Sequence, residues 1–86
     1  MDELWPALPH FDSHLCDEAH EKATNDIDSR AAVTWLISEY QDIYRRIRKN
    51  PVEQPIYEAR YNALASALRE YIAGESFDKS CKDNGI

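Results

Sequence analysis

Residues 29–49 read SRAAVTWLISEYQDIYRRIRK, and this stretch decides the fold. Its large apolar residues recur in alternating steps of three and four positions, which is the spacing of one stripe along an α-helix. The stripe consists of Val33, Leu36, Tyr40, Ile43 and Ile47. No glycine or proline interrupts the stretch. The sequence therefore predicts one continuous helix over residues 29–49.

A second stripe of the same period follows Pro51 and Pro55. Its members are Tyr57, Tyr61, Leu64, Leu68 and Tyr71. Two helices with matching stripes and a short proline-containing connection pack antiparallel. The sequence thus predicts an all-α fold built on a helical hairpin of residues 29–49 and 56–73.

The N-terminal part of the chain is predicted to add a strap and a third helix. Residues 1–11 place two prolines among large apolar side chains, and each proline disfavours helix at the residue before it. We therefore expect an extended strap that packs across the helices. Asp12 or Ser13 is then positioned to cap a shorter helix over residues 13–24.

The C-terminal part is predicted to carry little structure. Gly74 suits a helix stop, because glycine readily adopts the left-handed conformation that ends many helices. Residues 75–86 are mostly polar, and we expect a mobile tail with a single anchor at Phe77. All 86 residues form one small domain under this interpretation.

The hairpin alone leaves apolar surface uncovered, because Trp35, Ile37 and Tyr44 lie beside the main stripe and widen it. Two arrangements cover the excess. The strap and the first helix fold over the hairpin in a three-helix monomer, or two hairpins pair as a symmetric four-helix dimer with Trp35 or Tyr44 near the axis. The few large side chains in residues 13–24 slightly favour the dimer.

Composition narrows the classes of partner and location. The chain holds 16 acidic against 10 basic residues, for a formal net charge of −6, which argues against general binding to nucleic acid. No apolar run approaches the roughly 20 residues that cross a bilayer, so we expect no membrane partner. The acidic start MDELW does not resemble a signal peptide. With Cys16 and Cys81 expected to stay reduced, the sequence predicts a cytoplasmic protein.

The histidines and one cysteine gather in a single stretch, HFDSHLCDEAH, at residues 10–20. Cys16 and His20 lie one helical turn apart, a spacing at which a helix presents two ligands to zinc. A closed structural zinc site has four ligands, and the sequence shows no complete set. We therefore expect exposed polar residues and no cofactor. The alternative is a metal-binding or metal-stabilised protein with His10, Cys16 and His20 as ligands.

The same stretch offers no convincing catalytic site. Nucleophilic catalysis needs an activated serine or cysteine, a nearby base and donors for an oxyanion. Cys16 and His20 could approach each other, but no glycine-rich turn supplies backbone donors. The sequence predicts that the protein is not an enzyme.

Charge is distributed unevenly, with acids before residue 29 and bases at the end of residues 29–49. This pattern, together with the aromatic residues that lie outside the core stripes, predicts a small acidic protein-binding module such as an adaptor, inhibitor or regulatory factor. An acidic mimic of nucleic acid that blocks a basic groove is a further alternative. The candidate contact residues are Trp5, Trp35, Tyr44, Arg45, Arg46, Arg48, Asp17, Glu18 and Glu21.

Overall fold

The computed structural model describes residues 11–49 and 51–86, and within them the secondary structure is entirely helical. The helices are α1 (Ser13–Thr24), α2 (Arg30–Lys49), the short 3₁₀ helix η2 (Pro51–Glu53), α3 (Gln54–Ile72) and α4 (Phe77–Asp83). The prediction of an all-α fold is confirmed. None of the helices in the described part of the chain is long and apolar enough to cross a membrane.

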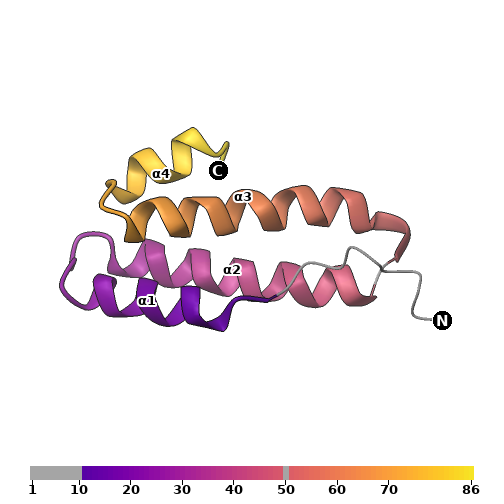
Figure 1. The fold of residues 1–86 in the computed structure, drawn as a ribbon, viewed down its shortest axis with the longest axis horizontal. Coiled ribbons are helices and arrows are strands. Elements are labelled where there is room, and N and C mark those ends of the chain that lie inside the picture. Colours follow the sequence, from indigo (N-terminus) through magenta and orange to yellow (C-terminus); the bar gives the residue numbers. More distant parts are fainter. Residues whose placement is uncertain (1–10, 50) are drawn as a thin grey trace.

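The predicted hairpin forms from α2 and α3, which run antiparallel on either side of η2 (Figure 1). Every member of the α2 stripe is buried, and so are four of the five members of the α3 stripe, with Tyr57 half-buried. Helix α2 begins one residue later than predicted, because the Ser29 carbonyl accepts its first helical bond, from the Val33 N–H at 2.8 Å. Helix α3 begins two residues earlier, with Pro55 in its first turn, where proline is tolerated.

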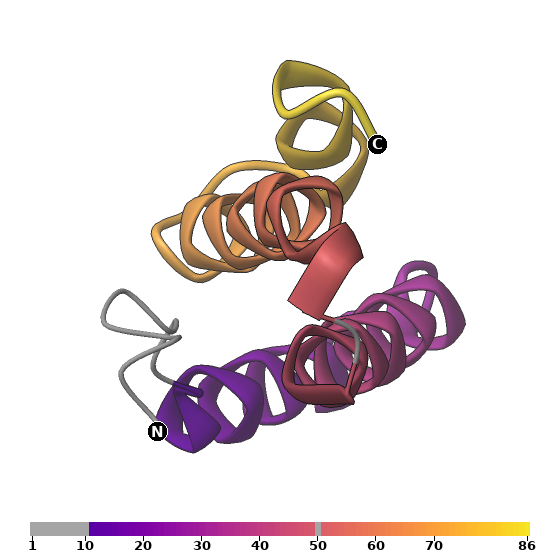
Figure 2. The same ribbon diagram turned by 90° about the vertical axis from the view of Figure 1, so that its right-hand side faces the viewer.

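Helix α1 completes a three-helix bundle by lying against both α2 and α3 (Figure 2). The Asp12 carboxylate caps it by accepting the Leu15 N–H at 3.1 Å, as predicted. Ala19 and Ala23 are fully buried, and such small side chains allow neighbouring helices to approach closely. The narrow apolar face of α1 therefore covers the hairpin because its small side chains let the helix lie close to α2 and α3, and it does not need large side chains to do so.

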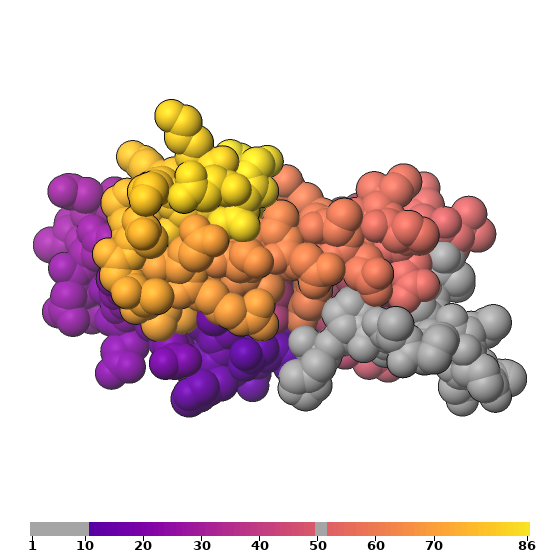
Figure 3. Space-filling view, turned by 45° about the horizontal axis from the view of Figure 1, so that its top comes forward, coloured from indigo at the N-terminus to yellow at the C-terminus, as the bar shows by residue number. Residues whose placement is uncertain are grey.

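Helix α4 corrects the prediction for residues 75–86, because the chain is helical from Phe77 to Asp83 instead of forming an unstructured tail. It lies on the side of α3 that faces away from α1 and α2, as the two ribbon views agree (Figures 1 and 2). Figure 3 shows it covering the second half of α3. Gly74 precedes it with a φ of 118°, as expected for a helix stop. The anchor at Phe77 is also present, since its ring is buried edge-on to Tyr71 with centroids 5.6 Å apart.

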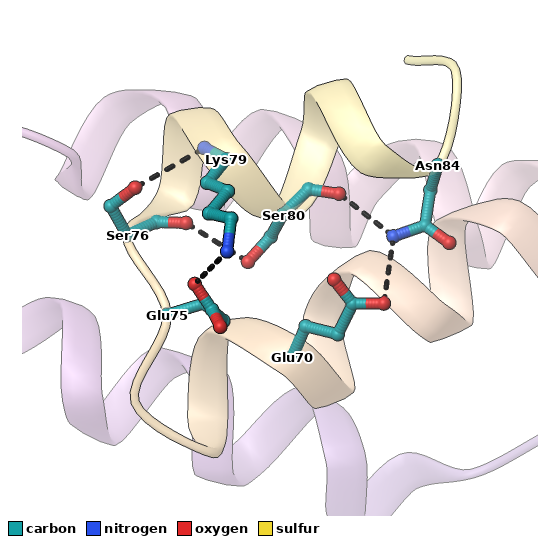
Figure 4. A network of polar contacts seen from close by, with 6 residues as sticks. All are labelled: Glu70, Glu75, Ser76, Lys79, Ser80 and Asn84. Carbon is teal, nitrogen blue, oxygen red and sulfur yellow. Dashed lines mark hydrogen bonds and ion pairs between the residues drawn. The ribbon is translucent and has the colours of Figure 1, made fainter.

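Polar contacts at both ends of α4 hold the helix together, and one of them joins it to α3 (Figure 4). The Asn84 amide donates to the Glu70 carboxylate at 3.2 Å and to the Ser80 carbonyl at 2.8 Å. The fully buried Ser80 hydroxyl donates to the Ser76 carbonyl at 2.9 Å. These bonds satisfy the polar groups that docking of α4 removes from water.

Candidate functional site

The side of α2 opposite the core forms a second stripe, which we call the Trp35 face. Its members follow one another in steps of four and three positions, so they line up along the helix. They are Ala31, Trp35, Ser38, Asp42 and Arg45. All are exposed except Asp42, which is half-exposed, so this side of α2 makes no contribution to the bundle core.

Trp35 is the most unusual residue of this face, because 50% of its surface stays exposed. The other large hydrophobic residues left exposed in the described part of the chain are aliphatic: Ile27, Val52 and Ile56. Ala31 and Ser38, one turn to either side of Trp35, are small and uncharged. An exposed indole between small neighbours is accessible to a flat partner surface, and tryptophan is enriched at the energetic centres of protein interfaces.

The basic residues at the end of α2 differ in what they contact. Arg46 donates to Asp42 at 2.9 Å, a hydrogen bond that raises the pKa of the guanidinium further. The Arg48 guanidinium lies 5.9 Å from the Tyr44 ring centroid. Arg45 and Lys49 are exposed and form no ion pair within residues 11–49 and 51–86. Of the three arginines predicted as contacts, Arg46 is thus already engaged within its own helix.

Tyr44 does not share a surface with Trp35, although both were predicted as contact residues. It is half-buried between Phe11, at 5.2 Å between ring centroids, and Tyr61, at 5.8 Å. Its edge helps line an open pocket of about 300 Å³ together with Phe11, Gln41 and Arg45. The structure therefore separates an aromatic cluster at the core margin from the exposed tryptophan.

Behind that pocket two tyrosines are stacked in the core. The Tyr40 and Tyr61 rings have centroids 4.6 Å apart, and their hydroxyl oxygens lie 2.8 Å apart. The Tyr40 hydroxyl also accepts the Asp12 N–H at 3.2 Å. Burial is the main cause that raises the pKa of Tyr61 far above 10, followed by its bond to Tyr40. The Tyr61 hydroxyl therefore stays protonated, and the pair of hydroxyls acts as an internal hydrogen-bonding group.

The predicted acidic contacts Asp17, Glu18 and Glu21 are exposed on α1. Glu18 lies 3.6 Å from the His14 ring, one turn earlier. Asp26, which follows α1, accepts a hydrogen bond from the Tyr71 hydroxyl at 2.8 Å, and this bond links the turn after α1 to α3. The sequence did not predict this last contact, because it joins residues 45 positions apart.

Of the predicted metal ligands, the two that the structure describes, Cys16 and His20, differ in their burial. Cys16 is 4% exposed within the core, whereas His20 lies at the surface. Burial, reinforced by the charges of Asp17 and Asp12, raises the pKa of the Cys16 thiol to about 11. Zinc binds the thiolate, which this environment disfavours. No group of three or more candidate metal ligands occurs in the described residues, while His10, like the predicted contact Trp5, lies outside them.

Three members of the Trp35 face, Ala31, Ser38 and Asp42, were missed by sequence reasoning. Their signal was the second seven-residue repeat on α2, hidden behind the stronger apolar stripe. Comparison of the chain with protein-family models, curated proteins and solved structures finds no match. The functional argument therefore depends on the geometry of this chain.

Proposed function

We propose that this protein acts by binding another protein, and that the Trp35 face is its contact surface. One observation carries the proposal: a tryptophan with half of its surface exposed stands on the free side of a helix whose other side is fully packed. The role is that of an adaptor, inhibitor or regulatory factor rather than an enzyme.

The energetic argument concerns the part of Trp35 that the fold leaves in water. A tryptophan buries about 150–250 Å² when it is fully enclosed, so about 100 Å² remains for a partner to cover. At about 25 cal/mol per Å², covering that area contributes about 2–3 kcal/mol. This is the size of contribution expected from a residue at the centre of an interface.

The chemistry of the cysteines supports a binding role over catalysis. Cys16, the candidate nucleophile, is buried, and its raised pKa suppresses the thiolate that would attack a substrate. Burial also raises the pKa of Cys81, and both residues are free thiols. Free thiols suit the reducing cytoplasm, which we propose as the location of the protein.

The proposal is tested by site-specific photo-crosslinking in the cells that produce the protein. A photoreactive amino acid replaces Ser38, at the centre of the Trp35 face, and a matched variant carries it at Asn62, which is exposed on α3. We expect a discrete protein adduct from position 38, its loss when Trp35→Ala is added, and no such adduct from position 62. Equal labelling from both positions, or an adduct indifferent to Trp35→Ala, refutes the proposal.

A further inference from the structure

We propose that the partner at the Trp35 face is a second copy of this chain, bound antiparallel so that Asp28, just before α2 in each copy, faces the basic end of α2 in the other copy. This inference rests on the proposed function, because it assumes that the Trp35 face is a contact surface. It adds the identity of the partner and the direction in which the two copies pair.

Charge polarity along α2 is the first support. Asp28 stands exposed just before the helix, whereas Arg45 and Lys49 stand exposed at its other end, and none of the three forms an ion pair in the part of the chain that the structure describes. Arg30, the first residue of the helix, is also exposed, but its guanidinium donates to the Thr24 carbonyl at the end of α1, at 2.9 Å. The 20 residues of the helix separate these ends by about 30 Å. Between them, Ala31, Trp35 and Ser38 carry no charge.

An antiparallel pair makes this one face complementary to itself. With a two-fold axis passing between Ser38 and Glu39, residue 28 of one copy lies across from residue 49 of the other, and residue 35 across from residue 42. Each Asp28 then faces the Lys49 of the other copy, so the pair occurs twice in the dimer, as the symmetry of a two-fold interface requires. A parallel pair would instead bring the basic ends together, which is unfavourable.

The same alignment gives Trp35 a suitable surface to cover. Across the axis, the indole reaches the turn of the other copy that contains Asp42 and Arg45, beside the small Ser38. The guanidinium group stacks readily on aromatic rings, and Arg45 is free to do so. Asp42 is already neutralised by Arg46 at 2.9 Å, so the indole meets no unpaired carboxylate there.

The overall charge of the chain favours this arrangement over unspecific association. Two copies, each with a formal net charge of −6, repel one another at long range. An alignment that sets opposite charges against each other reduces that repulsion. One face of a helix about 30 Å long and about 10 Å across offers roughly 300 Å², less than the roughly 800 Å² of a standard interface. The dimer is therefore expected to be weak and to dissociate on dilution.

The first experiment measures molar mass by sedimentation equilibrium at chain concentrations from about 5 to 500 μM, a range that spans micromolar dissociation constants. The mass of the unaltered protein should rise from 10.0 kDa towards twice that value. Trp35→Ala should raise the dissociation constant about 30-fold or more. Ile56→Ala, a matched change at an exposed residue outside the Trp35 face, should leave the constant unchanged. Circular dichroism verifies that each variant is folded.

The second experiment tests the antiparallel direction with the charge reversals Lys49→Glu and Asp28→Lys at low ionic strength. Each variant alone repels itself at both ends of the interface, so its dissociation constant should rise about tenfold. In an equimolar mixture, both ends of the heterodimer again pair opposite charges, and association should return to the original strength.

The outcomes separate this inference from the proposed function. A mixture that associates no better than its components refutes the antiparallel direction. Unaltered protein that stays at 10.0 kDa over the whole range overturns the second copy as partner. In that case, a Trp35-dependent adduct from position 38 to a different protein would still support the proposed function, whereas loss of that adduct as well would refute both.

Discussion

Replacing Tyr40 with phenylalanine should lower the free energy of unfolding by about 1.5–3 kcal/mol. The Tyr40 side chain is fully buried, and its hydroxyl has two partners, the Tyr61 hydroxyl at 2.8 Å and the Asp12 N–H at 3.2 Å. Each hydrogen bond contributes about 1 kcal/mol net, and a buried donor left without an acceptor costs about 1–3 kcal/mol. The two stacked rings remain in place, so the loss reports on the hydroxyl alone.

A double-variant cycle isolates the bond between the two hydroxyls. Tyr61→Phe removes that bond but leaves Tyr40 its contact with Asp12, so we expect a cost of about 1 kcal/mol. The double variant loses the shared bond only once. Its cost should therefore fall short of the sum of the single costs by at least about 0.5 kcal/mol.

Urea unfolding followed by far-ultraviolet circular dichroism gives the four free energies. For a chain of this size, each 1 kcal/mol corresponds to about 4–8 °C in Tm, which supplies an independent check. Tyr57→Phe is the matched control, because the Tyr57 hydroxyl donates at the surface to Glu53 at 3.0 Å, and its loss should cost about 0.5 kcal/mol or less. Strict additivity in the cycle, or a Tyr40→Phe cost no larger than that of the control, would refute the reasoning.

Three further predictions concern other parts of the molecule. The free energy of unfolding should fall as pH rises above about 10, which unfolding titrations at alkaline pH measure. Burial raises the pKa of Tyr71 to about 12 and also raises that of Tyr61. The folded chain therefore keeps protons that the unfolded chain releases in this range of pH. Phe77→Ala should lower the free energy of unfolding, measured in urea, by about 3 kcal/mol or more, since it removes the one buried aromatic ring of α4. In the same variant, the amides of α4 should lose their protection from hydrogen exchange while those of α2 keep theirs. Native Cys16 should resist a thiol reagent that labels the partly exposed Cys81, and equal labelling rates measured by mass spectrometry would contradict this.

Periodicity predicted the elements that bury a long stripe. Helices α2 and α3 each repeat an apolar pattern over at least four turns, so the hairpin followed from residue spacing alone. Helix α4 was missed because seven residues cannot display such a repeat. Its local signals were Ser76, whose hydroxyl accepts the Lys79 N–H at 3.2 Å, and Asp78 in the first turn. Those signals alone do not predict a helix, because a helix of seven residues is stable only when its apolar side chain, here Phe77, packs against a neighbouring helix.

The candidate site was predictable in part. The sequence indicated Trp35 as a residue beside the core stripe, and the structure shows how much of it the fold leaves exposed. It grouped Tyr44 with Trp35, because a stripe does not reveal which flank a neighbouring helix covers. It also grouped Cys16 with His20 by their four-residue spacing, yet α1 turns the cysteine into the core and leaves the histidine at its edge. In both cases the deciding information is the rotation of one helix against another, which spacing within a single helix does not contain.

The short connections between the helices also have a kinetic consequence. Helices α2 and α3 meet across η2 alone, and α4 follows α3 after a brief turn, so most native contacts join residues that are near in the chain. Such low contact order is typical of helical domains that fold within microseconds to milliseconds. Helix α1 is the exception, because it must reach α3 across the whole length of α2. Its contacts are therefore expected to form after the hairpin, late in folding, and substitutions at Ala19 should chiefly accelerate unfolding rather than slow folding.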